Sequence, residues 1–217
     1  MRMIEPSVEV TFFSPDNGLT SEEFIEAAAR TCYKSEDQMK PGSYAVLIDK
    51  LKKRGHFAMT EFGYAAARIV ADRGLTHALV RHRLASFAQE STCHNDYSDG
   101  KFGFHITVIE IPGETNPSPA LVDYYRDSCV IAEERYFGML EHGAEPEVAR
   151  MVLPIGIKAE IVIGANLREW RHIFEMRCAK TAHPIIRGIM LQVLQQFTDQ
   201  MPALYGDLAN KYLPESA

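Results

Sequence analysis

The sequence predicts one α/β (α+β) domain spanning residues 1–217, and three observations support this prediction. The chain has 217 residues, the length of a single domain with elaborations. Hydrophobic residues make up 46% and charged residues 24%, which is ordinary globular usage and excludes disordered and fibrous classes. Segments typical of strands are interleaved with segments of helical periodicity. No stretch supplies about 20 uninterrupted apolar residues, so no membrane-spanning helix is expected.

The expected strands are short runs rich in β-branched and aromatic residues. They cover residues 8–13, 62–70, 104–111 and 157–165. Residues 86–100 are rich in Ser, Thr, Asn and Asp and are expected to form a loop.

The expected helices are marked by apolar residues three or four positions apart and by capping residues. A capping box, Thr20 with Glu23, predicts a helix that begins after Thr20. Further helices are expected over residues 43–54, 75–83, 117–142, 144–151, 167–177 and 184–200. Gly55 and Gly143 are expected to end two of them, and Pro184 to open the last.

Charge and cysteine usage narrow the function. The net charge is −6, which disfavours binding to duplex DNA. Cations are nevertheless concentrated in two segments, 81–83 and 168–177, which suits small phosphate-bearing ligands and indicates a nucleotide enzyme. The cysteines are far apart and form no metal-ligand motif, so reduced thiols and no metal site are expected. Residues 1–10 show no secretory signal, so a cytoplasmic location is expected. These cysteines are Cys32, Cys93, Cys129 and Cys178.

The densest polar segment runs from Arg81 to Ser91. Arg81 and Arg83 are two positions apart, so on a helix they would point in different directions and serve different partners. The alternative is a solvated helix end, where cations complement the helix dipole.

This segment resembles the signature of the flavin-dependent thymidylate synthases: Arg81-His82-Arg83, seven residues, then Ser91. Three further blocks are similar to elements of that family and follow in the same order. They are Gly55-His56 with Glu61, residues 147–154 (EVARMVLP), and residues 166–172 (NLREWRH) leading to Arg177.

The resemblance implies a compact α/β domain with a central mixed or antiparallel sheet and flanking helices, assembled as a homotetramer whose active sites are built from more than one subunit. It also implies a reaction. FAD-containing enzymes of this family transfer the methylene group of methylene-tetrahydrofolate to dUMP and use NADPH as reductant, so that dTMP and tetrahydrofolate are formed.

The resemblance also assigns residues. Those implied to bind FAD are His56, Arg81, His82, Arg83, Gln89, Asn166, Arg168 and His172. Those implied to bind the nucleotide are Gln89, Glu90, Ser91, Arg150 and Arg177. Arg177 is the expected catalytic residue, because a permanently protonated guanidinium stabilises negative charge on the activated pyrimidine. A core histidine is the alternative for His56, and a surface ion pair is the alternative for Arg177.

The chain departs from the family pattern mainly on the nucleotide side. The family continues Ser-x-Arg-Tyr, whereas Cys93 and His94 occupy the last two positions here. Ala78 replaces a Gln or Glu, and Phe62 replaces a frequent histidine. Cys93 is either a small loop residue or a thiol that attacks the pyrimidine ring. One-carbon transfer to another nucleotide such as dCMP, and a non-catalytic flavin- or nucleotide-binding homologue, are the alternative functions.

Overall fold

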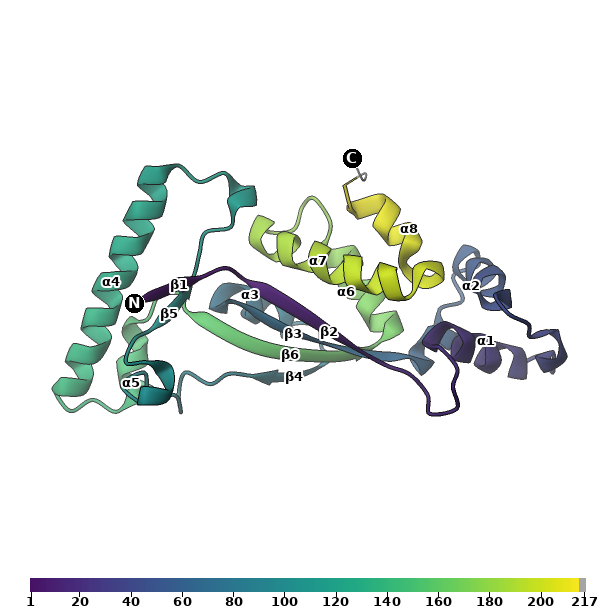
Figure 1. Cartoon of the computed structure of the whole chain (residues 1–217), viewed down its shortest axis with the longest axis horizontal. Coiled ribbons are helices and arrows are strands. Elements are labelled where there is room, and N and C mark those ends of the chain that lie inside the picture. Colours follow the sequence, from purple (N-terminus) through teal and green to yellow (C-terminus); the bar gives the residue numbers. More distant parts are fainter. Residues whose placement is uncertain (215–217) are drawn as a thin grey trace. The chain divides into compact units, whose positions relative to one another are not determined.

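A computed structural model gives the structure of residues 1–214 (Figure 1). The strands are β1 (Arg2–Ile4), β2 (Ser7–Phe13), β3 (Tyr64–Asp72), β4 (Ser86–Gln89), β5 (Thr107–Ile109) and β6 (Lys158–Asn166). The α-helices are α1 (Ser21–Thr31), α2 (Ser43–Lys53), α3 (Arg73–Leu79), α4 (Pro119–Glu141), α5 (Pro146–Ala149), α6 (Leu167–Arg177), α7 (Pro184–Gln200) and α8 (Pro202–Tyr212). Short 3₁₀ helices cover Glu36–Gln38, Ala58–Phe62, Gly100–Phe102, Gly113–Thr115 and Arg150–Val152.

The chain packs into two compact units. Within residues 1–214, the first unit contains residues 1–7, 69–81 and 88–161, and the second contains residues 8–68, 82–87 and those from 162 onward. The backbone passes repeatedly from one unit to the other, whereas separate domains are joined by few connections. The single domain over residues 1–217 stays a prediction.

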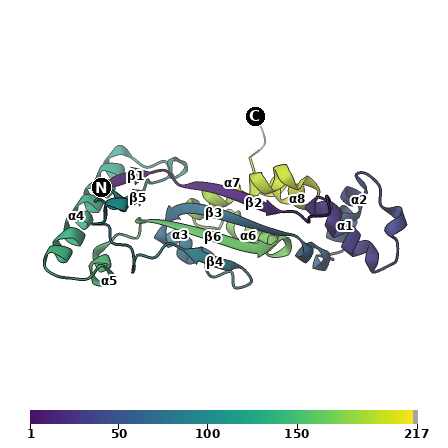
Figure 2. The ribbon, with the colours of Figure 1, turned by 60° about the horizontal axis from the view of Figure 1, so that its bottom comes forward.

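The larger sheet has the strand order β2-β3-β6-β4 (Figure 2). Strand β3 runs from the second unit into the first, and its neighbour β6 runs the opposite way. Strands β2 and β4 likewise run opposite to their neighbours. The larger sheet is therefore antiparallel, while β1 and β5 form a separate parallel pair. The α/β fold with a sheet flanked by helices is confirmed.

The first unit has a core built around α4. Tyr136 of this helix is fully buried, and its ring meets the ring of Tyr97 edge-on at 5.5 Å. Ile106, Val108 and Ile157 complete the same cluster from the segments beside it. Burying these apolar side chains is the main favourable contribution to the stability of this unit.

Aromatic side chains fill the core of the second unit. The ring of Phe197 on α7 lies 5.1 Å from Phe174 of α6 and 5.2 Å from Tyr205 of α8. Trp170 is fully buried, and its indole N–H donates to the carbonyl of Ala65 at 2.9 Å. This core fixes α6, which carries several of the predicted site residues.

The helix expectations agree closely with the structure where capping residues mark them. The capping box of Thr20 and Glu23 opens α1 as predicted. Asn166 caps α6 by accepting a hydrogen bond from the backbone N–H of Glu169. Helices α2, α4, α5 and α7 lie within the expected ranges. No helix within residues 1–214 is long and apolar enough to cross a membrane.

Several boundaries were wrong. Residues 86–100 are not all loop, because β4 forms there and the backbone N–H of Glu90 extends its pairing by donating to the carbonyl of Glu160 at 2.8 Å. The helix expected over 75–83 already ends at Leu79. The strand expected over 104–111 shrinks to β5, since Phe104 adopts a left-handed backbone with φ of 56°. Strand β1 and helix α8 were not predicted.

Candidate functional site

The Arg81-His82-Arg83 signature lies in a turn between α3 and β4. The argument from helix faces therefore does not apply to it, because the helix ends before the first arginine. Arg81 and Arg83 are exposed, whereas His82 is only 4% exposed. The signature thus presents two cations to solvent and buries the imidazole between them.

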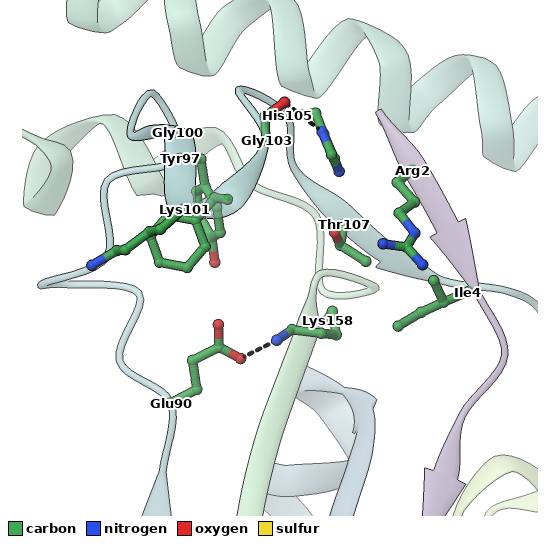
Figure 3. A pocket seen from close by; sticks show the side chains of 11 residues that line it. Arg2, Ile4, Glu90, Tyr97, Gly100, Lys101, Gly103, His105, Thr107 and Lys158 are labelled. Carbon is green, nitrogen blue, oxygen red and sulfur yellow. Dashed lines mark hydrogen bonds and ion pairs between the residues drawn. The ribbon is translucent and has the colours of Figure 1, made fainter.

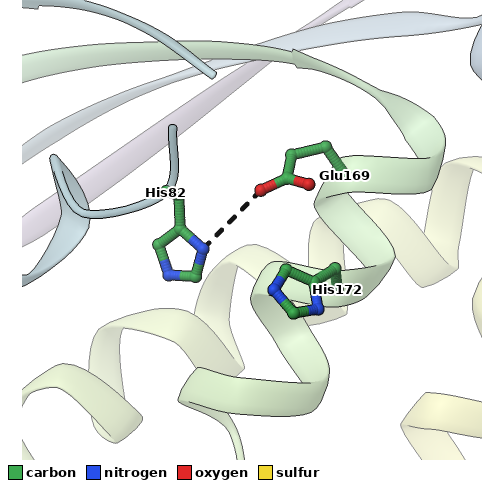
Figure 4. A group of neighbouring side chains, drawn as sticks. All are labelled: His82, Glu169 and His172. Atoms are coloured by element: carbon green, nitrogen blue, oxygen red, sulfur yellow. Dashed lines mark ion pairs between the residues drawn. The ribbon is translucent and has the colours of Figure 1, made fainter. Parts of the chain in front are cut away.

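His82 lies in a polar cluster of the second unit (Figure 4). Its Nε2 accepts a hydrogen bond from Nε of Arg177 at 2.9 Å. Its Nδ1 lies 3.7 Å from a carboxylate oxygen of Glu169, and its ring meets the ring of His172 edge-on at 5.9 Å. Helix α6 supplies all three neighbours, Glu169, His172 and Arg177.

The hydrogen bond from Arg177 defines the protonation of His82. Because a guanidinium only donates, Nε2 is the acceptor, and the single proton of the neutral ring lies on Nδ1, which faces Glu169. Burial, together with the nearby Arg177 and His172, lowers the pKa of His82 from 6.5 to about 4. The imidazole is therefore neutral at physiological pH, and its tautomer and orientation are fixed.

His82, Glu169 and His172 also have the composition of a metal site. Their ligand atoms lie within 4.8 Å of one another. The guanidinium of Arg177, hydrogen-bonded to the same imidazole, places a permanent positive charge beside them, which opposes a bound cation. The cluster is better suited to an anionic or polar ligand than to a metal ion.

His56 and Arg168 line one pocket of about 390 Å³ in the second unit. The pocket wall is otherwise largely apolar and includes Phe57 and Met59. Arg168, the second residue of α6, donates to the carboxylate of Glu61 at 2.6 Å. His56 is exposed, so the core-histidine alternative was wrong.

Arg150 lines a pocket of about 440 Å³ in the first unit. Its guanidinium donates to the Thr92 hydroxyl and to the Glu147 carbonyl, both at 3.2 Å. Arg73 and His77, one turn apart on α3, line the same pocket, and Nε of the arginine donates to Nε2 of the histidine at 3.3 Å. The pocket therefore combines two guanidinium groups with an imidazole.

The last three residues of the signature segment, Gln89, Glu90 and Ser91, have distinct surroundings. The Gln89 amide donates to the Thr76 hydroxyl on α3 at 2.8 Å, and the Glu90 carboxylate pairs with Lys158 at 2.7 Å. The Ser91 hydroxyl accepts the backbone N–H of Cys93 at 3.1 Å and therefore shapes the turn that follows it. The same hydroxyl also accepts the backbone N–H of His94 at 3.4 Å, and its role in binding the nucleotide stays a prediction.

Cys93 lies in that turn, and its thiol is 3.9 Å from a carboxylate oxygen of Glu147. Both interpretations of Cys93, a small loop residue and a thiol that attacks the pyrimidine ring, stay predictions.

The predicted residues fall into two groups. The second unit contains His56, His82, Arg83, Asn166, Arg168, His172 and Arg177, and the first unit contains Arg81, Gln89, Glu90, Ser91 and Arg150. Most of the residues assigned to FAD thus share the second unit, whereas the nucleotide residues other than Arg177 share the first.

The sequence analysis missed four residues that contact these groups. Glu169 lies between the recognised Arg168 and His172 but carries no motif of its own. Arg73, His77 and Thr92 line the Arg150 pocket or bond to Arg150. The spacing of Arg73 and His77, four positions apart just before the signature, is a signal that could have identified that pair.

The structure combines an α/β fold with pockets lined by cations, a combination suited to small anionic ligands. Residues 17–203 match the family model described as thymidylate synthase complementing protein, and the chain belongs to this family.

Named relatives agree with the family. The flavin-dependent thymidylate synthase of Corynebacterium glutamicum is 29% identical over 217 residues, covering 91% of this chain and 83% of that protein. The enzyme of the same name from Geobacter sulfurreducens is 26% identical over 190 residues, covering 84% and 80%. The crystal structure of PolB, a UMP/dUMP methylase from Streptomyces cacaoi bound with 5-Br dUMP, matches with a TM-score of 0.77 and 20% identity over 98% of both chains. At this identity the PolB match establishes the fold.

Proposed function

We propose that this protein is a flavin-dependent thymidylate synthase that converts dUMP to dTMP, with methylene-tetrahydrofolate as carbon donor and NADPH as reductant. The family match over residues 17–203 carries the proposal. The complete Arg81-His82-Arg83 signature with Ser91, and the names of the relatives, support it. A homotetramer acting in the cytoplasm is part of the same proposal.

The donor set of the second unit fits FAD. A pyrophosphate is bound best by fork-shaped cations, and Arg83 and Arg168 are both exposed. A flavin ring needs an apolar wall with a few polar groups, which the pocket of His56 and Arg168 provides through Phe57 and Met59. When bound, FAD supplies the hydride that completes the methyl group.

In this proposal the neutral His82 is a positioning residue as well as a cofactor contact. Its Nε2 accepts from Arg177 and holds that guanidinium in one orientation. Asn166 begins α6 by capping it, which sets the positions of Arg168 and His172 along the helix. Arg81, His172 and Gln89 are assigned to FAD with these residues.

We assign nucleotide binding to Arg150, Ser91, Gln89, Glu90 and Arg177. Arg150 binds the 5′-phosphate, and the neighbouring Arg73 supplies the positive charge that Cys93 does not. Arg177 stabilises the negative charge that develops on the pyrimidine when its C5 carbon forms a bond to the methylene carbon. Release of the C5 proton to solvent and departure of tetrahydrofolate would leave an exocyclic methylene group on the pyrimidine, and the hydride that bound FAD would supply would complete the methyl group of dTMP.

Product analysis tests this function. The purified protein is incubated with FAD, NADPH and methylene-tetrahydrofolate, with dUMP in one reaction and dCMP in a second. We expect dTMP and tetrahydrofolate from dUMP, together with NADPH consumption that depends on the nucleotide. A product from dCMP alone would identify the alternative one-carbon transfer. Flavin binding without any product would favour the non-catalytic homologue.

A further inference from the structure

A pocket of about 470 Å³ lies wholly within the first unit, and Glu90 is its one lining residue that the proposed reaction uses (Figure 3). Strand β1, the segment after β4, strand β5 and the start of β6 form its wall. The polar side chains that line it are Arg2, Glu90, Tyr97, Lys101, His105, Thr107 and Lys158.

The Tyr97 hydroxyl points to a ligand in this pocket. Tyr97 is only 3% exposed, and its ring is held edge-on against Phe102 at 5.2 Å and Tyr136 at 5.5 Å. Within the part of the chain that the structure describes, its hydroxyl has no hydrogen-bond partner. Figure 3 shows this hydroxyl on the side of the Tyr97 ring that faces Glu90. Buried hydroxyl groups are rarely left unsatisfied, so a bound group is expected there.

The available groups of the pocket are mainly hydrogen-bond donors. The Glu90 carboxylate already pairs with Lys158 at 2.7 Å and accepts the backbone N–H of Glu160 at 3.2 Å. Burial raises the pKa of Tyr97, so that its phenol keeps its proton and can donate. The Arg2 guanidinium, on an exposed residue of β1, adds charged donors on another wall. Protonated donors on two walls of one pocket favour an oxyanion.

Apart from Glu90, whose carboxylate pairs with Lys158, this pocket shares no lining residue with those assigned to the nucleotide. Successive side chains of an extended segment point to opposite sides. Gln89 bonds to Thr76 of α3, whereas Glu90 turns to Lys158 in the pocket. The Arg150 pocket has no lining residue in common with it.

We propose that this pocket is a second ligand site, for a small oxyanion of the phosphate or carboxylate type, bound by Tyr97 and Arg2. The proposal does not depend on the activity of the protein. The two chemistries are separated by the probes, inorganic phosphate and glutarate.

Calorimetric titration of the purified full-length protein with each probe tests the site. Tyr97→Phe removes the hydroxyl and keeps the buried ring, and Arg2→Gln removes a charge at an exposed position. We expect at least one probe to bind with a Kd of about 1 mM or tighter, and each variant to weaken it about tenfold. Arg126→Gln is the matched control, since Arg126 is an exposed cation of the same unit that pairs with Asp123, and it should bind as the wild type does.

Arg150→Gln separates this site from the Arg150 pocket. Binding that survives this substitution and is weakened by Tyr97→Phe supports the proposal. Binding lost in Arg150→Gln but unchanged in Tyr97→Phe would overturn it, as would the absence of binding by both probes. Raised thermal stability on adding the probe, seen in the wild type and reduced in Arg2→Gln, provides a second measurement that supports the proposal. Equal increases in both proteins would contradict it.

Discussion

The buried imidazole of His82 predicts a specific loss of stability in acid. Its pKa is lowered from 6.5 to about 4 by burial and by the neighbouring Arg177 and His172. Between these two pH values the unfolded chain binds a proton at this position and the folded chain does not. The free energy of unfolding therefore falls as the pH falls from 6.5 to 4, and the contribution is fully present above 6.5.

The size of this loss follows from the same pKa values. Each pKa unit corresponds to about 1.4 kcal/mol, so the 6.5-to-4 interval gives at most about 3 kcal/mol. His82→Gln provides the comparison, because glutamine does not titrate but its amide oxygen can still accept from Arg177. The difference in unfolding free energy between wild type and His82→Gln should decrease by up to about 3 kcal/mol from pH 6.5 to pH 4.

Urea unfolding at a series of pH values measures this difference, at one protein concentration because self-association changes apparent stability. Other titrating groups are common to both proteins and cancel. His94→Gln, a substitution at an exposed histidine, should retain the pH dependence of the wild type. A wild-type-minus-His82→Gln difference that is constant from pH 7 to pH 4 would refute the proposed environment of the imidazole.

Three further substitutions test the site and the core. Arg150→Gln should weaken dUMP binding about tenfold or more by calorimetry, through loss of a charged donor, while the flavin bound per chain stays the same. Arg168→Gln should lower the bound flavin per chain, measured by absorption, because the pocket it shares with His56 loses its cation. Trp170→Phe should reduce the free energy of unfolding by about 1–3 kcal/mol in urea, because it leaves the buried carbonyl of Ala65 without its indole donor.

Each of these expectations has a contradicting result. Equal loss of flavin and dUMP in Arg150→Gln would indicate general damage rather than a phosphate contact. Glu61→Gln is the control for Arg168→Gln, since it removes the ion pair but keeps the cation, and flavin loss in both variants would assign the effect to the pair. Unchanged stability of Trp170→Phe would show that the indole hydrogen bond contributes nothing.

Local signals predicted most of the helices. Thr20 and Glu23 fix the start of α1 through hydrogen bonds within four residues, which the sequence alone reveals. Strand β4 depends on partners far along the chain, as in the hydrogen bond from Glu90 to Glu160. Residues 86–100 are polar, so a loop was predicted there. Sheet pairing between distant segments leaves no local sequence pattern that would have indicated the strand.

The site was predicted unevenly for the same reason. The signature identified His82, but its burial and its bond to Arg177, 95 residues away, appear only in the structure. Glu169 was missed, since one acidic residue on a helix is usually solvated. Arg73 and His77 are recognised as candidate site residues only because the fold places Arg150, far along the chain, in the same pocket.

The visible absorption spectrum of the purified protein, followed by titration with dUMP, tests the proposed function most directly. We predict the bands of oxidised flavin in the protein fraction, or their appearance on adding FAD, and a saturable change of those bands as dUMP binds beside the ring. A protein that binds no FAD, or a flavin spectrum that dUMP leaves unaltered, would contradict the proposal.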